Sequence, residues 1–238
     1  MSKKFKLADS IVFENDHYFI INKPISYSVL DDRSDSDLPS LLELAKEYNS
    51  KAQVCHRLDK ETSGILVFSK TTDAYRNIAL QFEHREVAKI YHAIVHGRHK
   101  FEERVVELNL SHSSGITKVD KAGKFSSTII ETISVLHQFT LVECMPLTGR
   151  THQIRAHLSY LEAPIVGDEK YGGQAFYLSS IKKKFSIGKY DEEKPLLART
   201  ALHAFKIKFM DLDQKDIIAE APYPKDFQAS LKQLLKTK

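Results

Sequence analysis

The sequence predicts an α+β domain built around a large, mixed, mostly antiparallel sheet with helices on its flanks. In the middle of the chain, segments rich in β-branched and aromatic residues follow one another without a helical pattern between them, at residues 89–95, 104–110, 126–136 and 138–145. Segments with helical spacing lie before this region and near the end of the chain. The 238 residues suffice for a sizeable core, and the lack of a long linker favours one domain over residues 1–238.

The N-terminal third predicts two short strands and then a helix. Residues 11–13 and 18–21 are apolar and are separated by the turn-forming pair Asn15-Asp16. Pro24 ends the second strand, because proline has no N–H to donate to a neighbouring strand. Ser40 is of a type that caps helices and directly precedes apolar residues with helical spacing.

Four further elements complete the predicted fold. Residues 65–68 form a short apolar strand, and Thr71 caps an amphipathic helix after it. Residues 203–209 alternate between apolar and polar types, which predicts a late strand, and a closing helix follows Pro224. Residues 174–195 are expected to be a loop insertion, with a helical turn and a long surface loop.

Composition excludes several classes of protein. Hydrophobic residues make up 42% and charged residues 28%, as in ordinary globular proteins, so extended disorder and collagen-like repeats are excluded. The 35 Lys and Arg against 31 Asp and Glu give a net charge of +4, which permits an anionic partner without requiring one. Cys55 and Cys144 form no CxxC pair, and neither a signal peptide nor a membrane span is evident. We therefore expect a reduced, cytoplasmic protein with no role at a membrane.

The segment Cys55–Gly64 concentrates charged and turn-forming residues. Asp59 lies there between basic neighbours and before a Thr-Ser-Gly turn, so its carboxylate should stay ionised at neutral pH. An ionised carboxylate can act as a nucleophile or as an ion-pair partner. The alternative is an ordinary aspartate in a turn.

A second polar segment covers residues 147–158 and holds two of only nine arginines. Arginine matches phosphates and carboxylates with a planar fork of donors. If Thr151 begins a helix, Arg150 lies at its entrance, where main-chain N–H groups also favour an anion. The alternative is a solvated amphipathic helix with Ile154 and Leu158 facing the core.

Four blocks, in order along the chain, resemble those of the RluA-type pseudouridine synthases. They are Asn22-Lys23-Pro24; His56-Arg57-Leu58-Asp59 with Thr62-Ser63-Gly64; Lys89-Ile90-Tyr91; and Gly149 to Arg155 followed by Pro164-Ile165, Gly167-Asp168 and Tyr171-Gly172. The resemblance implies the pseudouridine synthase fold with a central catalytic cleft. It also implies isomerisation of a uridine to pseudouridine in a structured RNA, a ribosomal or transfer RNA stem-loop, by an enzyme that is expected to be monomeric and to use no metal or other cofactor.

By the same resemblance, Asp59 is the catalytic aspartate, and a carboxylate at an anomeric carbon has a precedent in retaining glycosidases. Tyr91 corresponds to the active-site tyrosine, which can stack on the uracil and assist removal of the C5 proton. Arg155 matches the basic residue that pairs with the aspartate.

The uridine must be flipped out of the RNA, and Arg57 resembles the arginine that fills the vacated space. The RNA-binding residues implied in this way are Arg57, His56, Arg150, His152, Lys23 and Thr62. For Lys23, a structural lysine at a strand end is the alternative.

The sequence departs from the family's pattern in three places. The first block starts at residue 22, which leaves no room for the small S4 RNA-binding domain of many relatives, so the catalytic domain is expected to grip RNA itself. Ile25-Ser26-Tyr27 stands where relatives often have a glycine and a nearby histidine. The insertion at 174–195 combines Lys182-Lys183-Lys184 with aromatic residues, which favours an RNA-gripping flap over a solvated loop.

Three other classes of function are alternatives to this hypothesis. A metal hydrolase is disfavoured because His152 and His157, five residues apart, lie on different faces of a helix and no HExxH or Cys/His cluster exists. A Cys55 nucleophile activated by His56 is disfavoured because sequence neighbours rarely point at each other. A catalytically silent RNA-binding protein is the serious alternative, and the simultaneous presence of Asp59, Tyr91 and Arg155 argues against it.

Overall fold

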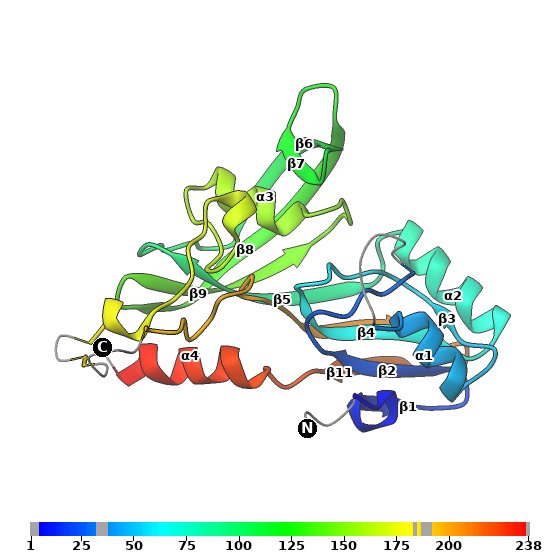
Figure 1. Cartoon of the computed structure of the whole chain (residues 1–238). Helices are drawn as coiled ribbons and strands as arrows, with labels where there is room; N and C mark the ends of the chain where they lie inside the picture. The colour runs from blue at the N-terminus through cyan, green and yellow to red at the C-terminus, as the bar shows by residue number, and fades with distance from the viewer. Residues whose placement is uncertain (1–4, 32–37, 183–184, 187–191, 237–238) are drawn as a thin grey trace. The chain divides into compact units, whose positions relative to one another are not determined.

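The computed structural model describes residues 5–31, 38–182, 185–186 and 192–236. Within these ranges the chain forms eleven strands and four α-helices (Figure 1). The chain divides into two compact units, one of Met1–Ile90 with Ala204–Pro222 and one of Tyr91–His203 with Tyr223–Lys238. Antiparallel pairing dominates both units, so the predicted α+β class with a mostly antiparallel sheet is confirmed. A single domain over the whole chain stays a prediction.

The first unit contains the N-terminal strands and two helices. Its strands run in the hydrogen-bonded order β1 (Ile11–Glu14), β2 (Tyr18–Lys23), β4 (Ser63–Ser69) and β10 (Leu202–Met210), with β3 (Gln53–Val54) paired to β4 and β11 (Asp216–Glu220) paired to β10. Its helices are α1 (Leu41–Tyr48) and α2 (Thr72–Glu83), preceded by a 3-10 turn, η1 (Leu7–Ser10). Most of β10 belongs to this unit, which therefore combines segments from both ends of the chain.

Local sequence signals explain the boundaries in this unit. β2 ends at Lys23, directly before Pro24, as predicted. Ser40 caps α1 through a reciprocal capping box with Glu43, and Thr71 accepts from the N–H of Ala74 at the start of α2. These side chains satisfy main-chain donors that a helix start would leave without a partner, so both predicted helices begin where the sequence indicates.

The second unit is built on a five-stranded antiparallel part of the sheet. Its order is β5 (Ala88–His96), β9 (Phe139–Pro146), β8 (Lys124–Leu136), β6 (Arg104–Ser113) and β7 (Ile116–Val119). The unit also holds α3 (Gln153–Tyr160), α4 (Lys225–Lys236), and two 3-10 turns, η2 (Glu169–Tyr171) and η3 (Leu178–Ser180). The uninterrupted run of strands from β5 to β9 confirms the pattern that predicted an antiparallel sheet.

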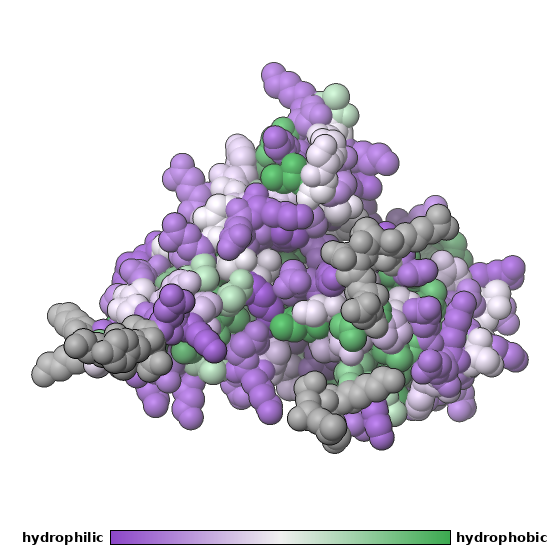
Figure 2. Space-filling view, viewed as in Figure 1, coloured by the Kyte–Doolittle hydropathy of each residue, from purple (hydrophilic) through white to green (hydrophobic). Residues whose placement is uncertain are grey.

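The core of this second unit lies where α3 and α4 pack on the strands. Ile154 and Leu158 are buried, but so is every residue from Gln153 to Leu158, so the start of this helix is not the solvated amphipathic helix that the sequence offered as an alternative. Phe227 and Leu234 of α4 belong to the same apolar cluster, whereas Leu235 on the same helix is about half exposed. Hydrophilic residues cover most of the face shown in Figure 2, with smaller apolar areas between them.

The segment 174–195 contains the expected helical turn at η3, and an isolated bridge joins Phe176 to Leu197 beside it. Lys182 is exposed, while Lys183 and Lys184 lie outside the described residues. No helix in the described part of the chain is long and apolar enough to cross a membrane.

Candidate active site

Asp59 lies on the loop that joins β3 to β4 in the first unit. The loop leaves the sheet after Cys55, whose N–H donates to the carbonyl oxygen of Val67 at 3.0 Å. Its far end closes in a turn, where the N–H of Thr62 donates to the carbonyl of Asp59 at 3.0 Å. Asp59 is partly buried and Arg57 is exposed, so the loop presents a carboxylate and a guanidinium group two residues apart.

Lys23 holds the inner side of this loop. The residue is fully buried, and its Nζ donates to the carbonyl oxygens of Pro24, Lys60 and Thr62 at 3.0, 3.0 and 2.9 Å. Two of these acceptors flank Glu61 in the loop that carries Asp59. Of the two roles predicted for Lys23, this burial agrees with the structural one. Thr62 is also buried, with 2% of its surface exposed.

His56 packs beneath the same loop. Its Nε2 accepts a hydrogen bond from the N–H of Val67 at 3.2 Å, and its ring lies 5.5 Å from that of Phe82 on α2. Burial, together with the charge of nearby Lys89, lowers the pKa of His56 to about 3, so the imidazole is neutral at physiological pH. A neutral imidazole whose Nε2 already accepts a main-chain hydrogen bond has no positive charge with which to bind a phosphate.

Gly64 at the start of β4 allows the neighbouring strand to come close. Its φ of +110° is a conformation that side-chain-bearing residues rarely adopt, and a Cβ would clash with the backbone of Ala204 on β10. The glycine of the Thr-Ser-Gly turn therefore serves the return of the Asp59 loop into the sheet.

Arg155 in the second unit is committed to a buried ion pair. Its Nε and Nη2 donate to the two carboxylate oxygens of Asp168, both at 2.7 Å, and both residues are largely buried. The guanidinium carbon also lies 4.8 Å from the ring centre of Tyr171. A bidentate pair with a stacked ring fixes the plane of the guanidinium group. Asp168 was not among the predicted site residues, although its Gly-Asp pair belongs to the fourth sequence block.

The helix that carries Arg155 begins at Gln153, not at Thr151 as proposed from the sequence. His152 has a left-handed backbone, with φ of 51°, which prevents the helix from extending further towards Thr151. The Oε1 of Gln153 accepts from the hydroxyl of Thr148 and the N–H of Arg150, at 2.7 and 3.0 Å, which organises the turn before the helix. The start of α3 is thus defined by a side chain from within the helix.

The polar residues before α3 have different surroundings. Arg150 is exposed, and its Nε donates to the carbonyl of Phe125 at 3.0 Å. The Nδ1 of His152 lies 2.9 Å from the hydroxyl of Tyr171, which accepts from the N–H of Thr117 at 2.7 Å. Arg150 can therefore reach a ligand in solvent, while His152 is oriented by Tyr171.

Tyr91 lies on β5, paired with Cys144 of β9, and is partly buried against the core of the second unit. The predicted residues therefore fall into two groups. Lys23, His56, Arg57, Asp59 and Thr62 gather at one loop of the first unit, and Tyr91, Arg150, His152 and Arg155 belong to the second unit.

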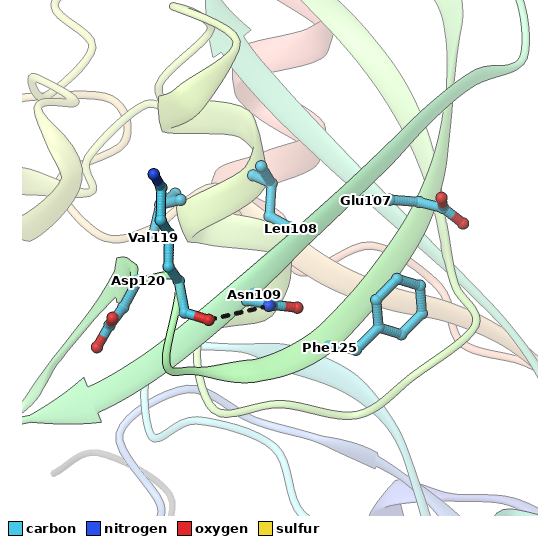
Figure 3. Close-up of a pocket in the computed structure, with 7 residues that line it drawn as sticks. Glu107, Leu108, Asn109, Val119, Asp120 and Phe125 are labelled. Carbon is cyan, nitrogen blue, oxygen red and sulfur yellow. Dashed lines mark hydrogen bonds between the residues drawn. The ribbon is translucent and has the colours of Figure 1, made fainter.

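A pocket of about 340 Å³ lies elsewhere, on β6, β7 and β8 (Figure 3). It is lined by Glu107, Leu108, Asn109, Val119, Asp120, Lys121 and Phe125. The amide of Asn109 donates to the carbonyl of Lys121 at 3.3 Å across it. None of the predicted site residues lines this pocket.

One group of potential metal ligands occurs among the described residues, formed by His17, Asp211 and Asp213. Asp211 is already engaged, because its carboxylate oxygens accept from Asn15 at 2.6 Å and lie 2.9 Å from Nδ1 of His17. Its Oδ1 also accepts from the N–H of Leu212 at 2.7 Å. Through these contacts, the buried carboxylate of Asp211 anchors the turn between β10 and β11.

Comparison with known proteins defines the class, which is that of RNA-modifying enzymes. The family model described as RNA pseudouridylate synthase matches residues 17–160. The chain belongs to this family, as the resemblance of the four sequence blocks predicted.

Individual relatives agree with the family match. Ribosomal large subunit pseudouridine synthase C of Vibrio cholerae is 34% identical over 99% of this chain and 71% of the relative, and the protein of the same name from Buchnera aphidicola is 34% identical over 98% and 76%. Among solved structures, human RNA Pseudouridylate Synthase Domain Containing 4 is similar with a TM-score of 0.74 and 26% identity, over 96% of this chain and 94% of the other. The chain is therefore an RNA pseudouridine synthase.

Proposed function

We propose that the protein isomerises specific uridines in ribosomal or transfer RNA, with Asp59 as the catalytic carboxylate acting on a flipped-out uridine. The observation that carries the proposal is the loop of residues 55–62, which anchors its main chain in the protein core while Asp59 remains partly accessible. Support for a ribosomal substrate comes from the relatives, which are named as large-subunit pseudouridine synthases.

The reaction breaks the C1′–N1 bond and forms a C1′–C5 bond, with N1 gaining a proton and C5 losing one. Atoms and electrons balance within the nucleotide, so no redox partner is required. A carboxylate can bond transiently to the sugar or base while the uracil rotates, and then leave again. A fixed main chain around Asp59 serves this step, because covalent catalysis depends on the approach of the nucleophile.

Tyr91 and Arg155 complete the proposed catalytic set. The ring of Tyr91 would stack on the uracil, and its hydroxyl would assist removal of the C5 proton. Arg155 would pair with Asp59 and fix its rotamer, a role that suits a guanidinium group whose plane Asp168 already fixes.

The exposed cations are the residues for which we propose contacts with RNA. Arg57 would fill the space left by the flipped base, and Arg150 would contact phosphate, with His152 on the wall of the site. Lys182 and its neighbours in the 174–195 segment would grip the RNA as a flap. We further propose that the enzyme acts as a monomer in the cytoplasm, without a metal or other cofactor.

The test is release of tritium from RNA labelled at C5 of uridine, followed by mapping of pseudouridines in ribosomal and transfer RNA from cells with and without the protein. We expect release with the wild type and none with Asp59→Ala, while RNA affinity is retained. Asp16→Ala removes an exposed carboxylate in the same unit and serves as the matched control. Equal activity in the Asp59 variant would overturn the assignment, and RNA binding without isomerisation by the wild type would favour the silent RNA-binding alternative.

A further inference from the structure

We propose that His56 is a positioning residue that fixes the Asp59 loop as a neutral hydrogen-bond acceptor, and that it does not contact RNA. The proposal rests on the proposed role of Asp59. It differs from what the sequence implies, because the second block places His56 beside Arg57 among the RNA-binding residues.

The imidazole takes the place of a main-chain acceptor at the edge of β4. β3 and β4 pair at Gln53 with Ser69 and at Val54 with Phe68, and the N–H of Cys55 then donates to the carbonyl of Val67. In a continued antiparallel ladder, the N–H of Val67 would return to the carbonyl of Cys55. His56 Nε2 accepts it instead, at 3.2 Å. The chain can therefore leave the sheet at this point without leaving a buried donor unpaired.

The surroundings of the ring define its tautomer. Nε2 is an acceptor, so the proton of the neutral ring is on Nδ1, and the ring makes a second hydrogen bond with the main chain of Arg57. Phe82 packs on the ring, and the Nζ of Lys89 lies 5.7 Å from the centre of the Phe82 ring. The positive charge of Lys89 also lowers the pKa of His56, so it opposes protonation of the ring.

Asp59 follows His56 by three residues, and the loop of residues 55–62 that carries both has two anchors. His56 ties its first residues to β4, and Lys23 ties its last residues to β2. Loss of the first anchor would let the carboxylate move by about an ångström, which typically lowers a rate about a hundredfold. Binding of the RNA would change little, because Arg150 and the other exposed cations outside this loop remain in place.

Two substitutions separate positioning from direct contact. His56→Leu retains bulk but offers no acceptor, so we expect kcat to fall about a hundredfold with the Kd for RNA unchanged. His56→Gln offers a carbonyl oxygen at a similar reach, and we expect it to recover most of the lost kcat. His84→Leu removes an exposed histidine at the end of α2 and is the matched control, for which we expect wild-type kinetics.

A readout that does not depend on activity is hydrogen exchange at the amide of Val67. Exchange should accelerate in His56→Leu and remain slow in His56→Gln and in the control. A raised Kd with unchanged kcat in His56→Leu, or a Gln variant as impaired as the Leu variant, would overturn the proposal. Unchanged Val67 exchange in an active protein would also overturn it while leaving the role of Asp59 intact. If the wild type is inactive but Val67 exchange accelerates in His56→Leu, the proposed function is refuted, and only the role of His56 in holding the loop remains.

Discussion

Replacing Lys23 by methionine should destabilise the first unit, because it removes the hydrogen bonds from Nζ of Lys23 to three carbonyl oxygens. The substitution keeps most of the side-chain volume but removes three charge-assisted hydrogen bonds at 2.9 to 3.0 Å. Each such bond contributes roughly 1.5–3 kcal/mol. In the wild type, the stabilisation from these hydrogen bonds is partly offset by the penalty for burying the ammonium group, which is on the order of several kcal/mol. We therefore expect a net loss of about 3 kcal/mol, the lower end of the range for breaking a buried charged network.

For a chain of this length, such a loss corresponds to a Tm lower by about 6–12 °C. Differential scanning calorimetry and urea unfolding measure it, and Lys51→Met, which removes an exposed lysine from the same unit, is the matched control. Isomerisation at low temperature should also slow, because Lys23 holds the carbonyls on either side of Glu61. A Lys23→Met protein that is as stable as the control but binds RNA weakly would refute this reasoning and restore the contact with RNA that the sequence also allowed.

Three other expectations concern the two units separately. Asp59→Ala should abolish tritium release while filter binding shows RNA affinity close to that of the wild type. Asp168→Asn leaves Arg155 as a buried cation without its bidentate partner, so the free energy of unfolding in urea should fall by about 3–5 kcal/mol, and the rate should fall with it. Burial lowers the pKa of His157 to about 4, below its unfolded value, so the unfolded chain binds more protons between these values. Stability should therefore decrease as the pH falls from about 6.5 towards 4, and by less in His157→Gln, as urea unfolding at several pH values would show.

Local signals in the sequence were sufficient for most elements. Ser40 and Thr71 mark helix starts because a cap acts within one turn of its own position, and β4 and β10 follow from runs of apolar or alternating residues. β3, β7 and β11 are not predicted from the sequence, because strands of only two to five residues gain most of their stability from the neighbour they pair with.

The parts of the candidate site that escaped prediction depend on contacts between distant residues. Lys23 meets carbonyls 37 and 39 residues away, and no pattern around Asn-Lys-Pro distinguishes a buried ammonium from an exposed one. Arg155 and Asp168 are 13 residues apart, on a helix and on the loop after it, so their pairing follows only from the fold. The one local signal that could have identified Asp168 is its place in the fourth block, directly after Gly167.

The net charge of +4 is a poor guide to RNA binding here, because the cations of the candidate site have unequal access to solvent. Lys23 is enclosed by carbonyls and Arg155 is committed to Asp168, so neither begins with a counterion that RNA could release. Arg57 and Arg150 are exposed and can neutralise phosphates. In the proposed assignment, Lys23 shapes the loop, Arg155 serves Asp59 from a fixed position, and the exposed cations meet the substrate. Affinity and catalysis should therefore respond to different positive charges, which is why variants of the two kinds must be compared at matched salt.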